Sequence, residues 1–140
     1  MDRKINVLLV DDSRTVLAQL ERLLGQLEGV AIVGMARNGA AAIRMTNESS
    51  PDLVLMDIVM PGLDGLSALR TIKAMHPEVE VAMVSSVSGN AAKAEEAFKL
   101  GACQVLGKPF DPELIESVLD SVREKLSGAK AATEGAREWA

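Results

Sequence analysis

The chain has 140 residues, of which 48% are hydrophobic, 25% charged and only 2% aromatic. This length predicts one domain that is large enough to bury a core. A net charge of −5 without a basic cluster disfavours nucleic acid and anionic membrane surfaces as partners. One histidine, His76, and one cysteine, Cys103, exclude a disulfide framework or a Cys/His zinc site within one chain.

The apolar segments are too short for a membrane protein. They are about as long as strands, whereas a membrane-spanning helix needs roughly 20 apolar residues. The first apolar run is also too short and too close to the N-terminus for a signal peptide. We therefore expect a cytoplasmic protein without membrane insertion, and the lone cysteine fits a reducing compartment.

Short apolar runs alternate with amphipathic stretches along most of the chain. In chain order, the runs predict strands at residues 7–10, 31–35, 53–56, 81–84 and 103–106. Uninterrupted runs of this length are typical of strands that are buried on both faces, as in a parallel sheet covered by helices. Cys103 opens the last run, so we expect its side chain in the core.

Helical patterns separate these strands. A leucine at every third or fourth residue predicts the first helix after the N-cap Ser13. Asp64 favours a turn before the third helix, and Pro77 ends that helix. Alanine-rich stretches near residues 40–48 and 91–100 predict the second and fourth helices. Five strands that alternate with five helices indicate a doubly wound α/β domain with helices on both faces of its parallel sheet.

The last predicted helix begins with a capping Asp111, followed by Pro112 in the first helical position. From Ser127 the composition becomes polar and alanine-rich. We therefore expect a domain at residues 1–126 and an appendage at residues 127–140. This appendage is interpreted either as a flexible linker or as an extension of the helix.

Polar side chains follow four of the predicted strands at their carboxyl ends. These side chains are Asp11, Asp12, Asp57, Ser85, Ser86 and Lys108. In open α/β sheets, ligands bind outside the carboxyl ends of the strands, so we expect these residues to converge. Three carboxylates that lie close together repel one another and require a cation. An all-oxygen ligand set favours Mg²⁺, and the Lys108 ammonium would balance the remaining charge.

A carboxylate beside Mg²⁺ can attack phosphorus and form an aspartyl phosphate. The metal ion offsets the charge that develops on the phosphoryl oxygens, while a lysine and a hydroxyl bind those oxygens directly. The sequence contains neither a glycine-rich phosphate loop nor a nucleophile–histidine pair. Nucleotide hydrolysis and serine-type hydrolysis are therefore disfavoured.

Four motifs occur in the order and at the spacing of response-regulator receiver domains. They are LVDDS at residues 9–13, DIVMPGLDG at residues 57–65, MVS at residues 83–85 and KPF at residues 108–110. The chain therefore resembles this family, including its single-domain chemotaxis members, over residues 4–126. The resemblance implies a flavodoxin-like fold with strand order 2-1-3-4-5 and a role in a two-component phosphorelay.

The resemblance also implies roles for the polar residues. Asp57 corresponds to the phospho-acceptor, which also contacts the metal. Asp12 corresponds to a direct Mg²⁺ ligand, and Asp11 to an acid that acts largely through water. The backbone carbonyl of Val59 would supply a further metal ligand. The phosphoryl donor would be a phosphohistidine on a sensor histidine kinase or on a phosphotransfer protein.

Ser85 corresponds to the switch hydroxyl, although a count back from Lys108 leaves room for Ser86. Lys108 corresponds to the lysine that contacts the phosphoryl group, and its bond to Pro109 is expected to be cis. Phosphorylation would pull Ser85 inward and change the surface of the fourth helix, fifth strand and fifth helix. That surface would bind a downstream protein or a second copy of the chain. The protein would then be a switch and not an enzyme.

Three other interpretations compete with a stand-alone regulator. The chain could be the receiver part of a larger regulator such as a chemotaxis methylesterase, because residues 83–89 resemble that class. A phosphatase with Asp57 as nucleophile is disfavoured, because Val59 occupies the place of its general acid. A receiver that is never phosphorylated is disfavoured by the complete set of acids and by Lys108.

The chain also departs from the family pattern. Many receivers carry an aromatic residue three positions before the lysine, and here that position is Val105. Switching would therefore proceed without an aromatic relay. Val59 and Val87 occupy two positions that influence the access of water to the acyl phosphate, so we expect slow self-dephosphorylation.

Overall fold

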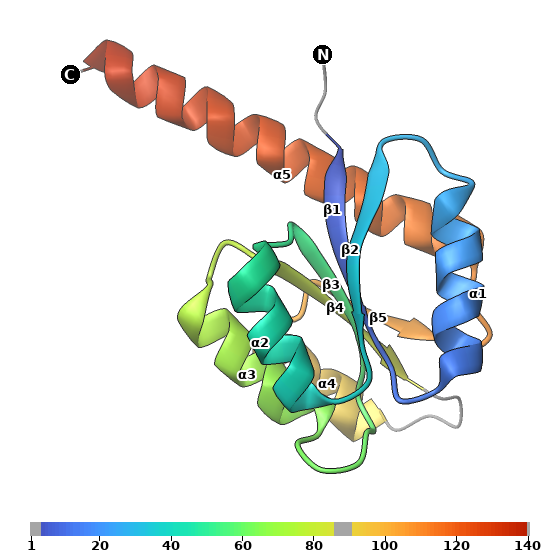
Figure 1. Ribbon diagram of the computed structural model, residues 1–140. Coiled ribbons are helices and arrows are strands. Elements are labelled where there is room, and N and C mark those ends of the chain that lie inside the picture. The colour runs from blue at the N-terminus through green and yellow to red at the C-terminus, as the bar shows by residue number, and fades with distance from the viewer. Residues whose placement is uncertain (1–3, 86–90, 140) are drawn as a thin grey trace.

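Within the described residues, five parallel strands form one central sheet in the order β2-β1-β3-β4-β5 (Figure 1). The structure is a computed structural model that describes residues 4–85 and 91–139, with only the backbone described from residue 128 onward. The strands are β1 (Ile5–Val10), β2 (Val30–Ala36), β3 (Leu53–Asp57), β4 (Glu80–Ser85) and β5 (Gln104–Gly107). The helices are α1 (Arg14–Gly25), α2 (Gly39–Ser49), α3 (Gly65–Met75), α4 (Ala91–Lys99) and α5 (Pro112–Trp139). The predicted doubly wound α/β fold and its strand order are confirmed.

The sheet is buried on both faces, as the uninterrupted apolar runs predict. Along β1, Leu8 and Val10 belong to a core cluster with α2, α3 and α4. The alternate residues Val7 and Leu9 belong to a second cluster with α1 and α5. Figure 1 shows the same division, with α2, α3 and α4 on one side of the sheet and α1 and α5 on the other. Consecutive side chains of a strand point to opposite faces, so one apolar run serves both clusters.

Side-chain caps fix the starts of three helices. Ser13 Oγ accepts a hydrogen bond from the Val16 amide at 3.3 Å, which confirms the predicted cap of α1. Asp64 Oδ1 accepts from the Ser67 amide at 2.8 Å, so this acid caps α3 and is not part of the acidic cluster. Asn38 Oδ1 caps α2 in the same way. These caps place the strand-to-helix connections, where the polar residues lie.

The last helix crosses the boundary expected at residue 127. It begins at Pro112, as predicted, and its backbone remains helical to Trp139. Figure 1 shows its final turns extending beyond the edge of the sheet. The appendage is therefore helical over residues 127–139, whereas the assignment of residues 1–126 as the domain stays a prediction. In the part of the chain that the structure describes, no helix combines the length and apolarity that a membrane span requires.

The expected place of Cys103 in the core is wrong. β5 begins one residue later, at Gln104, and Cys103 is exposed. Its amide still donates to the Val81 carbonyl at 2.8 Å, so the residue lies against the sheet at the start of the strand. Partial burial of the thiol, together with the carboxylate of Glu80, raises the pKa of Cys103 to about 11. A short apolar run does not show where strand pairing begins, and here pairing begins after the cysteine.

Candidate functional site

The predicted site residues lie at one edge of the sheet. Asp11 directly follows β1, Asp57 ends β3, Ser85 ends β4 and Lys108 directly follows β5. The strand register brings these ends together, because Asp57 pairs with Val84 and Ser85 pairs with Gly107 across neighbouring strands. The convergence expected from parallel strand ends is therefore present.

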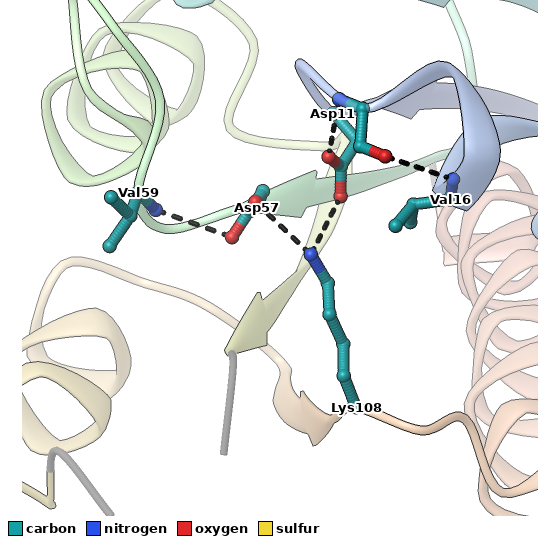
Figure 2. A network of polar contacts seen from close by, with 6 residues as sticks. Asp11, Val16, Asp57, Val59 and Lys108 are labelled. Carbon is teal, nitrogen blue, oxygen red and sulfur yellow. Dashed lines mark hydrogen bonds and ion pairs between the residues drawn. The ribbon is translucent and has the colours of Figure 1, made fainter. Parts of the chain in front are cut away.

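Lys108 lies between the two buried acids (Figure 2). Its Nζ is 3.1 Å from Asp11 Oδ2 and 3.3 Å from Asp57 Oδ2. The side chains of Asp11 and Asp57 are only 2% and 6% exposed, and that of Lys108 is 22% exposed. Two carboxylates can remain this deeply buried only with a counter-charge, and the ammonium supplies one.

Backbone amides hold the other oxygen of each buried acid. Asp11 Oδ1 accepts a hydrogen bond from the Ser13 amide at 2.9 Å. Asp57 Oδ1 accepts from the Val59 amide at 3.3 Å, as Figure 2 shows. Each carboxylate is therefore oriented from two directions, by an amide on one oxygen and by Lys108 on the other.

The acids also fit a hard cation. Asp11, Asp12 and Asp57 each offer a ligand oxygen, and the three oxygens lie within 4.8 Å of one another. Asp11 Oδ2 is buried, and its contact among the described residues is the Lys108 ammonium at 3.1 Å. A group of three carboxylates, two of them buried, fits Mg²⁺, which binds to oxygen ligands. The residues present therefore match the predicted metal.

The charges of the site shift the pKa values of two groups. Burial and the nearby Asp11 raise the pKa of Asp57, and Lys108 and the Val59 amide offset this only in part. Burial lowers the pKa of Lys108, but the two carboxylates outweigh burial and leave this pKa above its ordinary value. Lys108 is therefore protonated at neutral pH, and a further cation would favour the ionised form of Asp57.

Gly65 brings α3 against the backbone of Asp57. Its amide donates to the Ile58 carbonyl at 2.9 Å. A Cβ at this position would lie only 2.0 Å from the Asp57 carbonyl oxygen, so no larger residue fits without a shift. The motif that carries Asp57 thus includes a glycine that the close packing of α3 requires.

Arg37 contacts Asp12, and the sequence did not predict this contact. Its Nη2 donates to the Asp12 carbonyl at 3.2 Å. Arg37 directly follows β2, the one strand that contributes no residue to the predicted site. Extending the same rule to every strand would have included this residue.

The structure also places the remaining predicted residues. The Val59 residue is 58% exposed, and its amide rather than its side chain contacts Asp57. The Lys108–Pro109 bond is cis, as the resemblance implied. Ser85 ends β4, whereas Ser86 and Val87 lie outside the described residues. The roles of Ser85 as the switch hydroxyl and of the Val59 carbonyl as a ligand stay predictions.

Comparisons with known proteins give the same family. A family model for the response regulator receiver domain matches residues 7–120. The protein-glutamate methylesterase/protein-glutamine glutaminase 5 of Myxococcus xanthus is 40% identical over 105 residues, which are 75% of this chain and 30% of that protein. The response regulator UvrY of Escherichia coli is 36% identical over 118 residues, which are 84% of this chain and 54% of UvrY.

A solved structure agrees with these sequence matches. The crystal structure of the CheX-CheY-BeF3-Mg+2 complex from Borrelia burgdorferi has a TM-score of 0.78 and 29% identity, covering 86% of this chain and 90% of that chain. The chain spans only 30% and 54% of the two curated relatives above, so the match concerns their receiver part. With a family model that matches most of its length, this chain belongs to the response regulator receiver domain family.

Proposed function

We propose that this receiver domain is a phospho-accepting switch, with Asp57 as the acceptor and Mg²⁺ as the metal. The observation that carries the proposal is the pairing of buried Asp57 and Asp11 through one lysine, inside a group of three acids. Asp11, Asp12, Asp57 and the Val59 carbonyl would hold the ion. A purely structural ion pair would not need a third acid beside the two buried carboxylates.

Phosphoryl transfer would proceed by attack of an Asp57 oxygen on the phosphorus of a phosphohistidine or phosphoramidate. The phosphorus–nitrogen bond breaks, and its electron pair leaves on the nitrogen, which takes up a proton. Mg²⁺, when bound, would offset the charge on the phosphoryl oxygens. Lys108, already 3.3 Å from Asp57 Oδ2, would contact one of these oxygens, and the Ser85 hydroxyl would contact another.

The Mg²⁺ requirement is supported by two observations. The acid cluster offers the ligand type that this ion prefers. The Borrelia burgdorferi CheX-CheY complex contains BeF3 and Mg+2. We extend this pairing of metal and phosphoryl-like group to the present chain.

The output would be a change in the surface formed by α4, β5 and α5. Phe98 on α4 is 49% exposed, so α4 offers apolar area to a protein partner or to a second copy of the chain. Val105 on β5 is only partly exposed and packs against the core, in place of the usual aromatic residue. The chain would act by binding a partner and not as an enzyme. It would work in the cytoplasm and receive its phosphoryl group from a histidine kinase or phosphotransfer protein.

A receiver within a larger regulator is the second candidate. The Myxococcus xanthus relative is a methylesterase of which this chain matches 30%, and UvrY is likewise longer than the match. In such a protein the helical continuation of α5 would connect the receiver to an output domain. The complete open reading frame distinguishes the two candidates.

The acceptor can be tested directly. The purified chain is incubated with acetyl phosphate or phosphoramidate and Mg²⁺, and its intact mass is measured. We expect one phosphoryl group on the unchanged chain and none on Asp57→Asn. Asp64→Asn is a matched control, because Asp64 caps α3 outside the acidic cluster and asparagine also caps helices. The absence of an adduct on the unchanged chain with every donor would overturn the proposal.

A further inference from the structure

Two hydrogen bonds join the end of β2 to the segment that carries the acids. The Asp11 amide donates to the Ala36 carbonyl at 3.0 Å. The Arg37 guanidinium, through Nη2, donates to the Asp12 carbonyl at 3.2 Å. One bond starts at Asp11 and the other ends at Asp12, so together they hold the Asp11–Asp12 backbone against the end of β2.

The backbone at Arg37 is itself fixed from both sides. The preceding residue, Ala36, ends β2 and is only 2% exposed. The following residue, Asn38, caps α2, because its side chain accepts from the Ala41 amide at 2.8 Å and its carbonyl accepts from the Ala42 amide at 3.0 Å. Arg37 is therefore anchored between a strand and a capped helix, and its side chain can act as a tether.

The same connection also touches the loop after β3. Gly39 begins α2, and a Cβ there would lie 2.5 Å from the Leu63 carbonyl oxygen. Leu63 belongs to the segment that follows Val59, the predicted carbonyl ligand. Asp12, Arg37 and Leu63 line one open groove. The β2–α2 connection thus contacts both loops that would hold the metal.

Asp12 differs from the other two acids in how it is held. Asp11 and Asp57 are buried, and their carboxylates accept bonds from backbone amides and pair with Lys108. Asp12 is the exposed acid of the cluster, and Arg37 holds it through its main-chain carbonyl. An exposed ligand without such a tether would lose more conformational freedom when it binds an ion.

We propose that Arg37 is a positioning residue for the Mg²⁺ ligand Asp12. This inference rests on the proposed metal site. Arg37 does not touch the ion; it fixes the backbone from which the Asp12 carboxylate reaches the ion. Pre-organised ligands bind more tightly, because less ordering remains to be done on binding.

The direction in which removal of Arg37 changes the Mg²⁺ affinity distinguishes positioning from electrostatic repulsion. The Arg37 guanidinium is a positive charge near the acids, and it repels Mg²⁺. Through charge alone, removal of Arg37 would therefore strengthen Mg²⁺ binding. Through positioning, the same removal weakens binding.

The test is a calorimetric titration of the full chain with MgCl₂. We expect Arg37→Ala to weaken Mg²⁺ binding by roughly threefold to tenfold, the equivalent of one net hydrogen bond. Arg37→Lys, which keeps the charge and a donor, should recover part of this loss. Arg44→Ala is the matched control, since Arg44 lies on α2 in an exposed pair with Glu48 at 3.9 Å and should leave the affinity unchanged.

Urea denaturation with EDTA accompanies the titration, and we expect Arg37→Ala to be fully folded in the absence of urea, so that a weaker affinity does not reflect loss of the fold. Mg²⁺ affinity that is equal or tighter in Arg37→Ala would overturn the inference. Failure of the unchanged chain to bind Mg²⁺ would overturn both this inference and the proposed metal site. If the unchanged chain binds Mg²⁺ but Asp57 is never phosphorylated, the proposed function fails, while the affinities still decide the role of Arg37.

Discussion

Asp57 is buried and yet oriented for chemistry, because each of its oxygens has a partner. Oδ1 accepts from the Val59 amide and Oδ2 pairs with Lys108. The same lysine pairs with Asp11, so one ammonium serves two buried acids. At the scale of the residue, the site is a balance of one positive and two buried negative charges, which a divalent ion would complete.

Cys103 gives a prediction about pH that does not involve this site. Partial burial and Glu80 raise its pKa to about 11. At pH 8 such a thiol is ionised in about one molecule in a thousand, compared with about a quarter for an ordinary cysteine. We therefore expect alkylation by iodoacetamide at pH 8 to be roughly 20-fold slower than for an ordinary exposed cysteine, because the ionised fraction is about 250-fold lower and the more basic thiolate is more than about tenfold more nucleophilic.

The pH profile of alkylation checks this expectation. The rate should keep rising to about pH 11, and Glu80→Gln should move the profile to lower pH, because it removes a negative charge beside the thiol. A rate that reaches half its maximum near pH 8.5 in the unchanged chain would show that the raised pKa is wrong.

At the scale of the element, the sequence predicts all five strands, but their ends differ. The apolar run at residues 7–10 misses the first two residues of β1, because Asn6 interrupts the run. Strand pairing continues through this polar residue, and the Asn6 amide donates to Asp52 Oδ2 at 2.8 Å. Hydrophobic patterns locate the buried centre of a strand, whereas pairing and loop contacts decide its ends.

The acids and the lysine of the site are predictable because parallel strands end at one edge. The same rule applied to β2 places Arg37 at this edge, but its partner Asp12, 25 residues away in the chain, appears only in the folded structure. From the sequence alone, Gly65 indicates only a turn before α3. Its close approach to the Asp57 carbonyl appears only when α3 is packed on β3.

Gly65→Ala tests that packing. A Cβ would lie 2.0 Å from the Asp57 carbonyl oxygen, so α3 or the acceptor backbone must shift. We expect the free energy of unfolding to fall by about 1–3 kcal/mol, the usual cost of overpacking. Urea denaturation measures the change.

Gly25→Ala is the control. Gly25 lies in the last turn of α1, and a Cβ there would meet nothing within 4 Å. Alanine is the better helix former, so this variant should be as stable as the unchanged chain or slightly more stable. If the two variants lose equal stability, the close packing at Gly65 is not the cause.

At the scale of the whole molecule, α5 joins the predicted domain to the helical appendage. Of the described side chains in α5, the buried ones are Ile115, Val118, Leu119 and Val122, and Leu126 packs partly against them. The family match also ends at residue 120. The domain at residues 1–126 stays a prediction.

A shortened chain that ends at residue 127 tests this boundary. We expect its free energy of unfolding to lie within about 0.5 kcal/mol of that of the full chain, the range typical of changes away from a core. Thermal and urea denaturation of both chains provide the comparison. A loss of several kcal/mol would place part of the core in residues 128–140.

The central claim is that Asp57 receives the phosphoryl group, and peptide mapping tests it most directly. The chain is phosphorylated with phosphoramidate and Mg²⁺, reduced with borohydride to convert the acyl phosphate to a stable alcohol, and digested for mass spectrometry. The account predicts conversion of Asp57 alone, with Asp11 and Asp12 unchanged. Conversion at either of those acids, or none at Asp57 in a chain whose intact mass carries a phosphoryl group, would contradict it.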